Sequence, residues 1–324
     1  MKIKSLLVFL LVMVLFVSGC QDKEPEKPAI KEIKGGIDVI VEEGLPQGVI
    51  RNKVFPLTFK LRNTGYSSAS GVITVKGTSS FLEFKDTFGS SVMKSFPFQD
   101  FEGRTTLSAN PAERAYSLIV IPYLDDRTES KKVNIEFLLC YSYSAIFKQS
   151  VCVDTRPNAP QEQKACEFVS QTFKGQGAPI NVVSLEQRTY TEDEGYRSKR
   201  KVEFIITLRN MMEGSPIPVE SALPGPNNYC TGGKLPEDTN MGYIEFGNIR
   251  LGDVMMGTSK RGVRFDCKGL SFGQRKVPFV DNQAQIVCTA TFDEDVQPYT
   301  SLLEIPLRFG YYSDMMIPIK IYRN

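Results

Sequence analysis

After residue 36 the sequence consists largely of short segments in which apolar and polar side chains alternate. Leu57, Phe59 and Leu61 share one face of the first such segment, and residues 133–143 repeat the pattern. A period of two is typical of a strand with one buried face, because successive side chains point to opposite faces of a sheet. Gly and Asn turn signals separate the segments. The chain is therefore expected to be all-β, with its strands packed as immunoglobulin-like β-sandwiches.

Two features recur along the chain and indicate an internal duplication. The tripeptide Leu-Arg-Asn ends one strand at Leu61–Asn63 and another at Leu208–Asn210. Residues 133–143 align without gaps on residues 301–311, with aromatic residues matched at two positions. Convergent patterning is the alternative, since any two alternating strands align tolerably. The shared tripeptide and the matched aromatic residues favour two tandem copies of one sandwich.

The duplication and the N-terminus together divide the chain into five parts. They are a signal peptide at 1–19, a lipidated tether at 20–36, a first sandwich at 37–155, a linker at 156–179 and a larger second sandwich at 180–324. The linker is rich in Pro, Gln and Gly, and each half is long enough to bury its own core. The halves are expected to fold separately, each closing with a hairpin, at residues 133–153 and 301–321.

The first 20 residues have the layout of a secretory signal peptide. Lys2 and Lys4 precede an unbroken apolar run, residues 6–17, which is shorter than the roughly 20 residues of a spanning helix. The run ends in small residues, and Val17–Cys20 resembles the lipobox of prokaryotic lipoproteins. The resemblance implies cleavage before Cys20 and lipidation of its thiol. The alternative is an uncleaved single-pass anchor ending near Cys20, and either leaves the rest of the chain outside the membrane.

The composition excludes several functional classes. The chain contains no His, which excludes Ser-His-Asp triads, Cys-His pairs and His-ligated metals. Lys and Arg number 39 and Asp and Glu 37, so removal of Lys2 and Lys4 with the signal leaves 37 of each sign. Nucleic-acid-binding proteins normally carry a basic excess, so no nucleic-acid partner is expected. There is also no Gly-rich phosphate-binding loop, and no cofactor is expected.

Apart from Cys20, the chain has an even number of cysteines. They are Cys140, Cys152, Cys166, Cys230, Cys267 and Cys288. In an exported chain this predicts three disulfides, although many pairings are possible. Cys140 and Cys152 flank the first expected hairpin and Cys267 and Cys288 flank a turn, which leaves Cys166 to pair with Cys230. A zinc site would need closely spaced pairs such as Cys-x-x-Cys, so no metal is expected.

Three acidic clusters are candidates for calcium binding or for carboxylate catalysis. They are Asp125–Asp126, Glu192–Glu194 and Asp293–Asp295. Each lies between expected strands, and none has the spacing of an EF-hand loop. The basic run Arg197–Lys201 beside the second cluster is interpreted as part of a charged turn. The clusters are interpreted as solvated turns as well, and no catalytic residue is assigned.

Residues 56–77, PLTFKLRNTGYSSASGVITVKG, resemble the start of prokaryotic Ig-like surface domains of the cell-adhesion-related (CARDB-like) and archaeal S-layer-associated type. In such domains a strand ending in Asn-x-Gly leads through a Gly/Ser turn into a second β-branched strand. In the second half the glycine is displaced to Gly214. The segments CYSYSAIFKQSVCV, KACEF and GQGAPINV also resemble a group of archaeal envelope proteins that have no assigned activity. The resemblance implies a surface role and carries over no active site.

The expected function is that of an extracytoplasmic lipoprotein, anchored to the cell membrane through Cys20, with a structural, adhesion or binding role. Its expected partners are the membrane and an envelope protein or polysaccharide, and no enzymatic activity is expected. One alternative is an accessory subunit of a cell-surface transporter or pilus complex. A further alternative is a hydrolase that works without His.

Overall fold

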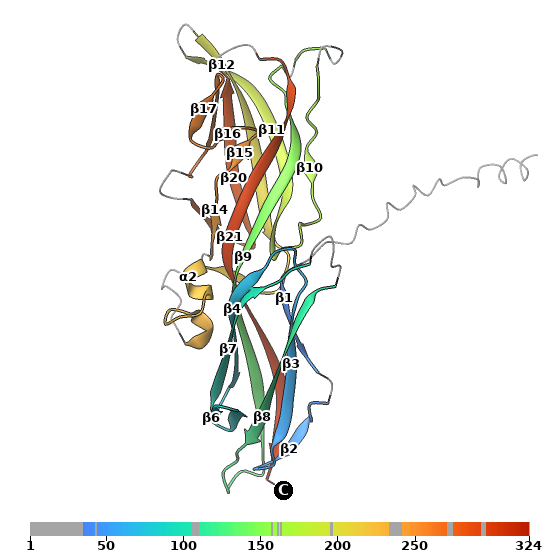
Figure 1. The fold of residues 1–324 in the computed structure, drawn as a ribbon, viewed down its shortest axis with the longest axis vertical. Helices are drawn as coiled ribbons and strands as arrows, with labels where there is room; N and C mark the ends of the chain where they lie inside the picture. The colour runs from blue at the N-terminus through green and yellow to red at the C-terminus, as the bar shows by residue number, and fades with distance from the viewer. Residues whose placement is uncertain are drawn as a thin grey trace, which may run out of the picture. The chain divides into compact units, whose positions relative to one another are not determined.

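The computed structural model describes residues 35–323, apart from residues 43, 105–109, 157, 161, 163, 195–196, 233–241, 271–274 and 293–295. In this part of the chain almost all regular structure is β, arranged in three sheets (Figure 1). With one exception, a parallel pairing of a three-residue strand, neighbouring strands run antiparallel. The prediction of an all-β sandwich fold is confirmed.

The strands of each sheet come from separate parts of the sequence. The five-stranded sheet has the order β1 (Ile37–Val41), β3 (Phe55–Asn63), β8 (Ala112–Pro122), β5 (Leu82–Asp86), β6 (Gly89–Ser91). The six-stranded sheet has the order β10 (Gln171–Thr172), β11 (Ile180–Glu194), β12 (Arg197–Asn210), β20 (Gln283–Phe292), β18 (Val263–Cys267), β17 (Thr258–Lys260). The ten-stranded sheet has the order β16 (Val254–Met255), β15 (Arg250–Leu251), β21 (Tyr299–Tyr322), β9 (Ser130–Val153), β4 (Ala69–Gly77), β7 (Met93–Phe101), with β2 (Gly48–Ile50), β13 (Ser215–Ile217), β14 (Gly242–Phe246) and β19 (Lys276–Phe279) attached at its sides.

Strands β9 and β21 contain 24 residues each and form the centre of the ten-stranded sheet. They pair antiparallel over their whole length, from Ser130 opposite Tyr322 to Val153 opposite Tyr299. At about 3.3 Å per residue, each strand is roughly 80 Å long. The inward face of β9 is the predicted one, since Ile135 and its alternating neighbours up to Tyr143 are buried.

The predicted hairpins at residues 133–153 and 301–321 are wrong, because both segments are single straight strands. In β9, residues 144–150 contain no Gly, Pro, Asn or Asp that would favour a turn. In β21, Gly310 lies within the strand and serves close packing instead. A Cβ atom there would lie 2.7 Å from the carbonyl oxygen of Ile217 in β13, so only glycine lets β13 approach this closely.

The three sheets pack as two layered halves. In the first half, Phe59 of β3 lies between the sheets, with its ring centroid 5.2 Å from Phe137 of β9 and 6.0 Å from Phe96 of β7. In the second half, the six-stranded sheet covers the C-terminal part of β9 and the N-terminal part of β21. There the ring centroids of Phe292 in β20 and Tyr299 in β21 lie 6.5 Å apart. Most buried apolar residues of both halves form one continuous cluster, to which β9 and β21 contribute in each half. A smaller cluster around Cys140 and Cys230 is separate from it.

All described residues fall within a single compact unit. The first half contains the N-terminal part of β9, which pairs with β4 from Ile135 to Tyr143. The segment that was expected to be a linker contains β10 and Cys166, which is tied to β9 by a disulfide. The shared pair of β9 and β21 argues against the expectation that the two halves fold separately, and unfolding of the isolated first half would decide the question.

The repeated Leu-Arg-Asn tripeptide ends in an asparagine that ties each strand to its following loop. Asn63 donates from Nδ2 to the Ser67 carbonyl oxygen (2.9 Å) and accepts from the Gly65 N–H (3.1 Å). Asn210 repeats the pattern, donating to the Gly214 oxygen (2.8 Å) and accepting from the Met212 N–H (3.3 Å). An amide supplies the donor and the acceptor that both bonds need. These equivalent bonds support the proposed duplication.

Three tyrosines are buried where the two halves meet along β9 and β21. The rings of Tyr141 and Tyr311 lie 5.6 Å apart, and Tyr143 lies beside Tyr141 at 6.3 Å. The Tyr311 hydroxyl donates to Asn210 Oδ1 at 2.8 Å, and the Tyr143 hydroxyl donates to the Gly177 oxygen at 3.1 Å. Burial raises the pKa of all three hydroxyls, because a phenolate would lose its hydration in the core.

The raised pKa values predict alkaline unfolding. Below about pH 9 these tyrosines are neutral in both states, so stability is retained. At higher pH the unfolded chain loses protons that the folded protein keeps, so the free energy of unfolding should fall by about 1.4 kcal/mol per tyrosine per pH unit. Urea unfolding between pH 8 and 11 measures this slope. Tyr141→Phe should reduce it, because this variant lacks one of the three buried hydroxyls; a slope unchanged from that of the unmodified protein would contradict the prediction.

Candidate functional site

All six predicted cysteines are in disulfides. The pairs are Cys140–Cys230, Cys152–Cys166 and Cys267–Cys288. The predicted pair Cys267–Cys288 is confirmed, and these residues face each other in the register of β18 and β20. Disulfides persist in oxidising compartments, so the chain is extracytoplasmic.

The predicted pairs Cys140–Cys152 and Cys166–Cys230 are wrong. Both rested on a hairpin that would bring Cys140 and Cys152 opposite each other. Because β9 is one straight strand, twelve residues separate them, or about 40 Å, whereas a disulfide joins Cα atoms roughly 6 Å apart. Cys140 pairs instead with Cys230, and Cys152 near the end of β9 pairs with Cys166.

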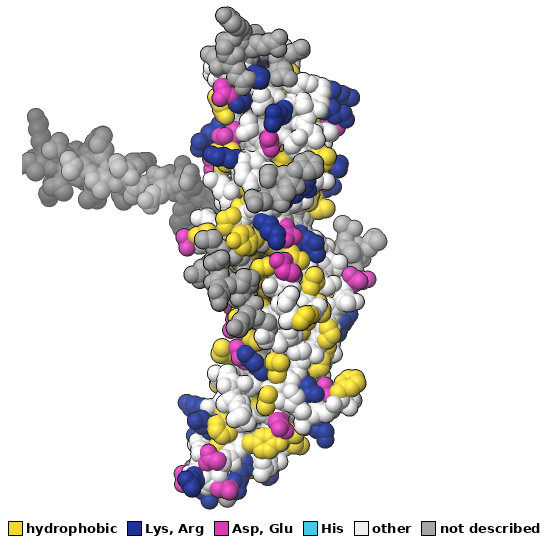
Figure 2. All heavy atoms as spheres, turned by 90° about the vertical axis from the view of Figure 1, so that its left-hand side faces the viewer, with side chains coloured by type: hydrophobic (Ala, Val, Ile, Leu, Met, Phe, Trp, Pro, Cys, Tyr) yellow, Lys and Arg dark blue, Asp and Glu magenta, His cyan; other side chains and the backbone are white. Residues whose placement is uncertain are grey.

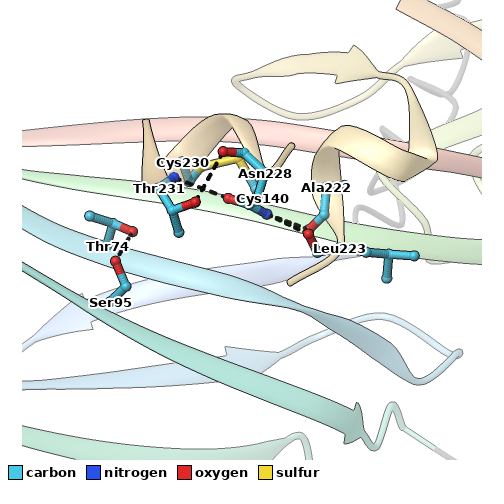
Figure 3. Close-up of a disulfide and its surroundings, with 8 residues drawn as sticks. All are labelled: Thr74, Ser95, Cys140, Ala222, Leu223, Asn228, Cys230 and Thr231. Carbon is cyan, nitrogen blue, oxygen red and sulfur yellow. Dashed lines mark hydrogen bonds between the residues drawn. A yellow bond between two sulfur atoms is a disulfide. The ribbon is translucent and has the colours of Figure 1, made fainter. Parts of the chain in front are cut away.

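Cys140 fastens an excursion of the chain over the outer face of the ten-stranded sheet (Figure 3). The excursion contains β13, the short helix α2 (Val219–Ala222) and the 3-10 turn η2 (Tyr229–Thr231). Asn228 holds it together, donating to the carbonyl oxygens of Ala222 and Leu223 at 3.0 Å each. The disulfide closes a separation of 90 residues, worth about 4–5 kcal/mol in the chain-entropy treatment. This element has a structural role.

A half-open pocket of about 330 Å³ lies at the end of the second half where β9 terminates. One wall is the chain that follows β9, and the other is the β11–β12 hairpin. The walls contribute Thr155, Arg156 and Asn158 on one side and Thr189, Thr191 and Arg200 on the other. Thr191 and Arg200 are paired across β11 and β12. The described lining therefore combines two guanidinium groups with hydroxyls and an amide.

A buried ion pair supports this pocket. Lys164 Nζ lies 2.8 Å from Asp154 Oδ2, and the two side chains are only 8% and 9% exposed. Asp154 also accepts from the Arg156 N–H at 3.0 Å, which fixes the turn after β9. The Cys152–Cys166 disulfide holds the segment of Lys164 against the end of β9.

Hydrogen bonds also join the two walls directly. The Arg200 guanidinium donates to the Thr155 carbonyl oxygen at 2.9 Å. The Thr189 hydroxyl donates to the Asp154 carbonyl oxygen at 2.8 Å. The pocket is therefore preorganised on a rigid scaffold, which is the usual setting of binding loops. The described lining residues offer hydroxyl, amide and guanidinium groups, which can form hydrogen bonds with the polar groups of a ligand.

The cluster Asp125–Asp126 lies in a turn, as expected. The interpretation of Glu192–Glu194 and of the basic run Arg197–Lys201 as turns is wrong, because they belong to the paired strands β11 and β12. Asp125 accepts from the Arg127 N–H at 3.0 Å. A hydrogen bond with the Thr128 hydroxyl, and then this backbone bond, lower the pKa of Asp125. Asp126 pairs with Arg51 at 2.5 Å, and Glu192 pairs with Lys201. The cluster Asp293–Asp295 lies outside the described residues. Among residues whose placement is described, no three Asp, Glu or Cys side chains gather as metal ligands.

The proposed lipidation site Cys20 and the apolar run before it lie outside the described residues. Within the described part, none of the helices has the length and apolar character needed to cross a bilayer. On the face presented in Figure 2, Lys and Arg side chains are interspersed with Asp and Glu. The described residues on that face therefore form no extended patch of one sign.

Sequence reasoning missed the two arginines of the pocket. Arg156 falls in the segment interpreted as a linker, and Arg200 falls in the basic run Arg197–Lys201 that was interpreted as a charged turn. The basic run was the one available signal. Its partner wall lies more than 40 residues away along the chain, so no local spacing could connect them.

Comparison with known proteins adds no relative to this picture. No protein-family model matches the chain, and no curated protein matches it significantly. The functional argument therefore rests on the sequence and on the geometry described above.

Proposed function

We propose that this chain is a lipid-anchored extracytoplasmic binding protein, in which the tether after Cys20 carries a rigid β-sandwich unit. The observation that carries the binding role is the preorganised polar pocket at the end of β9. Its walls are joined by the Arg200–Thr155 hydrogen bond and supported by the buried Asp154–Lys164 pair. Loops held on a rigid β scaffold are the common location of binding sites. The lipobox-like residues Val17–Cys20 support the anchor.

The anchor predicts a specific effect of Cys20→Ser. The hydroxyl cannot replace the thiol as acceptor of the diacylglycerol, so the variant should leave the membrane fraction or accumulate as a longer, uncleaved form. Membrane fractionation, gel mobility and metabolic labelling with a radioactive fatty acid measure these outcomes. Ser18→Ala is the matched control, because it keeps a small residue before the cleavage site and should be processed normally. Unchanged membrane partition and mobility in Cys20→Ser, with no label in the unmodified protein, would overturn the proposal.

An accessory-subunit role is a second proposal, supported by an apolar group on the outer face of the five-stranded sheet. Ile119 of β8 is 43% exposed and pairs with Pro56 of β3, while nearby Val54 and Tyr123 are 60% and 37% exposed. Contiguous exposed apolar side chains favour a protein partner. Affinity purification of the full chain from detergent-solubilised membranes tests this role. A partner that copurifies in fixed ratio, and is lost in Ile119→Lys, would support it; retention of the partner would oppose it.

A further inference from the structure

One side of β9 has no strand partner over part of its length. On the side away from β21, β4 pairs with β9 only up to Tyr143, which lies opposite Ala69, the first residue of β4. β9 continues into the second half, where Cys152 near its end is joined to Cys166. Among the described residues, no strand pairs with this side of β9 between these two points. We call residues 144–150, about 23 Å of strand, the β9 edge.

Alternate residues of the β9 edge direct their backbone groups to the open side. In an antiparallel pair, successive residues point their N–H and C=O groups to opposite sides of the strand. The register of β9 with β21 has no shift, and the Asn134 carbonyl oxygen accepts from the Thr78 N–H on the β4 side. The same alternation directs the backbone groups of Ile146 and Lys148 away from β21. This region is accessible, since Ile146 is 55% exposed and the Lys148 side chain is 54% exposed.

The β9 edge lacks the features that usually prevent an edge strand from pairing with other chains. β7, the long strand at the other end of this sheet, has them. Pro97 lacks a donor, Lys94 places a charge opposite buried Val75, and a register shift interrupts the pairing of β7 with β4. Residues 144–150 contain no proline, glycine or register shift. The β9 edge is therefore suited to the addition of a further strand.

The internal duplication provides a matching edge in the first half. Residues 131–143 of β9 correspond to residues 299–311 of β21 at an offset of 168, and the partners of these two segments are related by the same offset. The C-terminal part of β21 is therefore the counterpart of the C-terminal part of β9. There an extended segment, β2, lies on the edge and pairs in parallel with the last residues of β21. Within the same chain, this kind of edge thus accepts an added extended segment.

The surroundings of the β9 edge select a short segment over a second long strand. If β9 of a second copy paired along this edge, it would run on past residue 144 into the place that β4 occupies. A chain end or loop of about five or six residues, the usual length of a strand, fits within the edge. Ile146 favours an apolar residue opposite it, and Lys148, two residues along the same face, favours an acidic one.

We propose that the β9 edge binds an extended segment of another extracytoplasmic protein by strand addition, with an apolar residue opposite Ile146 and an acidic residue opposite Lys148. The backbone groups of these two residues hold the segment, and its alternate side chains provide selectivity. The inference goes beyond the proposed functions, because neither the polar pocket nor the apolar group around Ile119 forms part of this edge.

Hydrogen exchange of the full chain in detergent, resolved to single residues by mass spectrometry, tests the edge directly. In the free protein the amides of Ile146 and Lys148 should exchange fast, whereas the Phe147 amide, which faces β21, should exchange slowly. The probe is a synthetic peptide of alternating threonine and valine residues in which one valine is replaced by glutamate. Saturating peptide should slow the two edge amides at least about tenfold, because it removes them from water. Edge amides that are already slow in the free protein, or that the peptide leaves unchanged, would overturn the proposal.

Lys148→Pro removes one donor from the edge. The Lys148 N–H points away from β21, so the variant keeps the hydrogen bonds between β9 and β21. Peptide binding should weaken about tenfold or more. Met316→Pro is the matched control, because Met316 is the counterpart of Lys148 at the offset of 168 and is 52% exposed on the edge of the first half. Thermal melting checks that both variants are folded.

Two modified peptides test the edge without any change to the protein. N-methylation of the amides in one alternate set should abolish binding, and N-methylation of the other set should leave it unchanged, because only one side of the peptide faces β9. A peptide with lysine in place of the glutamate should bind more weakly to the unmodified protein, whereas Lys148→Ala should bind the two peptides equally.

Three further results would overturn the proposal. They are equal peptide binding by Lys148→Pro and Met316→Pro, equal effects of the two N-methylated peptides, and a dimer of the chain in sedimentation whose formation slows exchange at the edge amides. The last result would assign the edge to a second copy. These experiments depend on neither the lipid anchor nor the polar pocket, so their failure would leave the proposed function untouched.

Discussion

A fragment comprising residues 35–156 is expected to remain unfolded by itself, although it contains β1 to β9. In the full chain the N-terminal part of β9 pairs on one side with β4 and on the other with the C-terminal part of β21. The fragment lacks β21, so one whole edge of β9 would lose its hydrogen-bonding partner. This outcome is the reverse of what two separately folding sandwiches would give.

The fragment would also lose core contacts, which further lowers its expected stability. Ile319 and Ile321 of β21 are buried in the first half, at 2% and 0% exposure, and burial of each contributes about 1.5–3 kcal/mol. In the fragment, Phe147 and Val151 of β9 would also lose the second half that covers them. Set against a typical domain stability of about 5–15 kcal/mol, these losses are large.

Circular dichroism and urea unfolding of the fragment provide the measurement. We expect no cooperative transition. The matched control is the same fragment extended by a flexible linker and residues 312–323, which restores the missing part of β21 and should recover cooperative unfolding. Cooperative unfolding of the unextended fragment, with a native-like β spectrum, would show that β21 is dispensable and would support separate domains.

The sequence predicted which residues of the strands are buried, because alternation is a local property. Phe59 and Phe137 lie inward as their patterns indicated. It did not predict which strands pair, because the pairing of β9 with β21 joins segments about 170 residues apart. Strand length was also misleading. Most strands contain about five or six residues, so an apolar alternation of 24 residues was divided into a hairpin.

The candidate site was predictable only in its cysteines. Their number indicated three disulfides, and the Cys267–Cys288 pair followed from local sequence. The pocket depends on two walls, carrying Arg156 and Arg200, that meet through tertiary packing. The ion pair between Asp154 and Lys164 was equally hidden, because Asp154 lies at the end of the expected first sandwich and Lys164 falls inside the expected linker at 156–179. Composition indicated exposure there, and most described residues of the segment are indeed exposed or half-buried, but the side chain of Lys164 is shielded beside Asp154.

Lys164→Met is expected to lower the free energy of unfolding by about 3–5 kcal/mol. The Lys164 ammonium lies 2.8 Å from the Asp154 carboxylate, and both side chains are less than a tenth exposed. Removing the ammonium leaves a carboxylate that is shielded from water and has lost its counter-charge. The cost arises from that unpaired charge more than from the lost attraction, because a buried pair gains little over a well-packed apolar substitute.

Two comparison variants separate burial from ion pairing as such. Lys260 and Asp253 form a pair with the same 2.8 Å separation, but both side chains are 51% exposed. Lys260→Met should therefore cost less than about 1 kcal/mol. Asp154→Asn combined with Lys164→Met removes the buried charge and should recover most of the stability lost in Lys164→Met. Urea unfolding of the unmodified protein and of the three variants measures the three differences in the free energy of unfolding. Equal losses in Lys164→Met and Lys260→Met would mean that the Asp154–Lys164 pair is no more shielded than a surface pair. Asp154 also accepts the hydrogen bond that fixes the turn carrying Arg156. Equal losses would therefore also mean that the Asp154–Lys164 pair does not support the pocket wall.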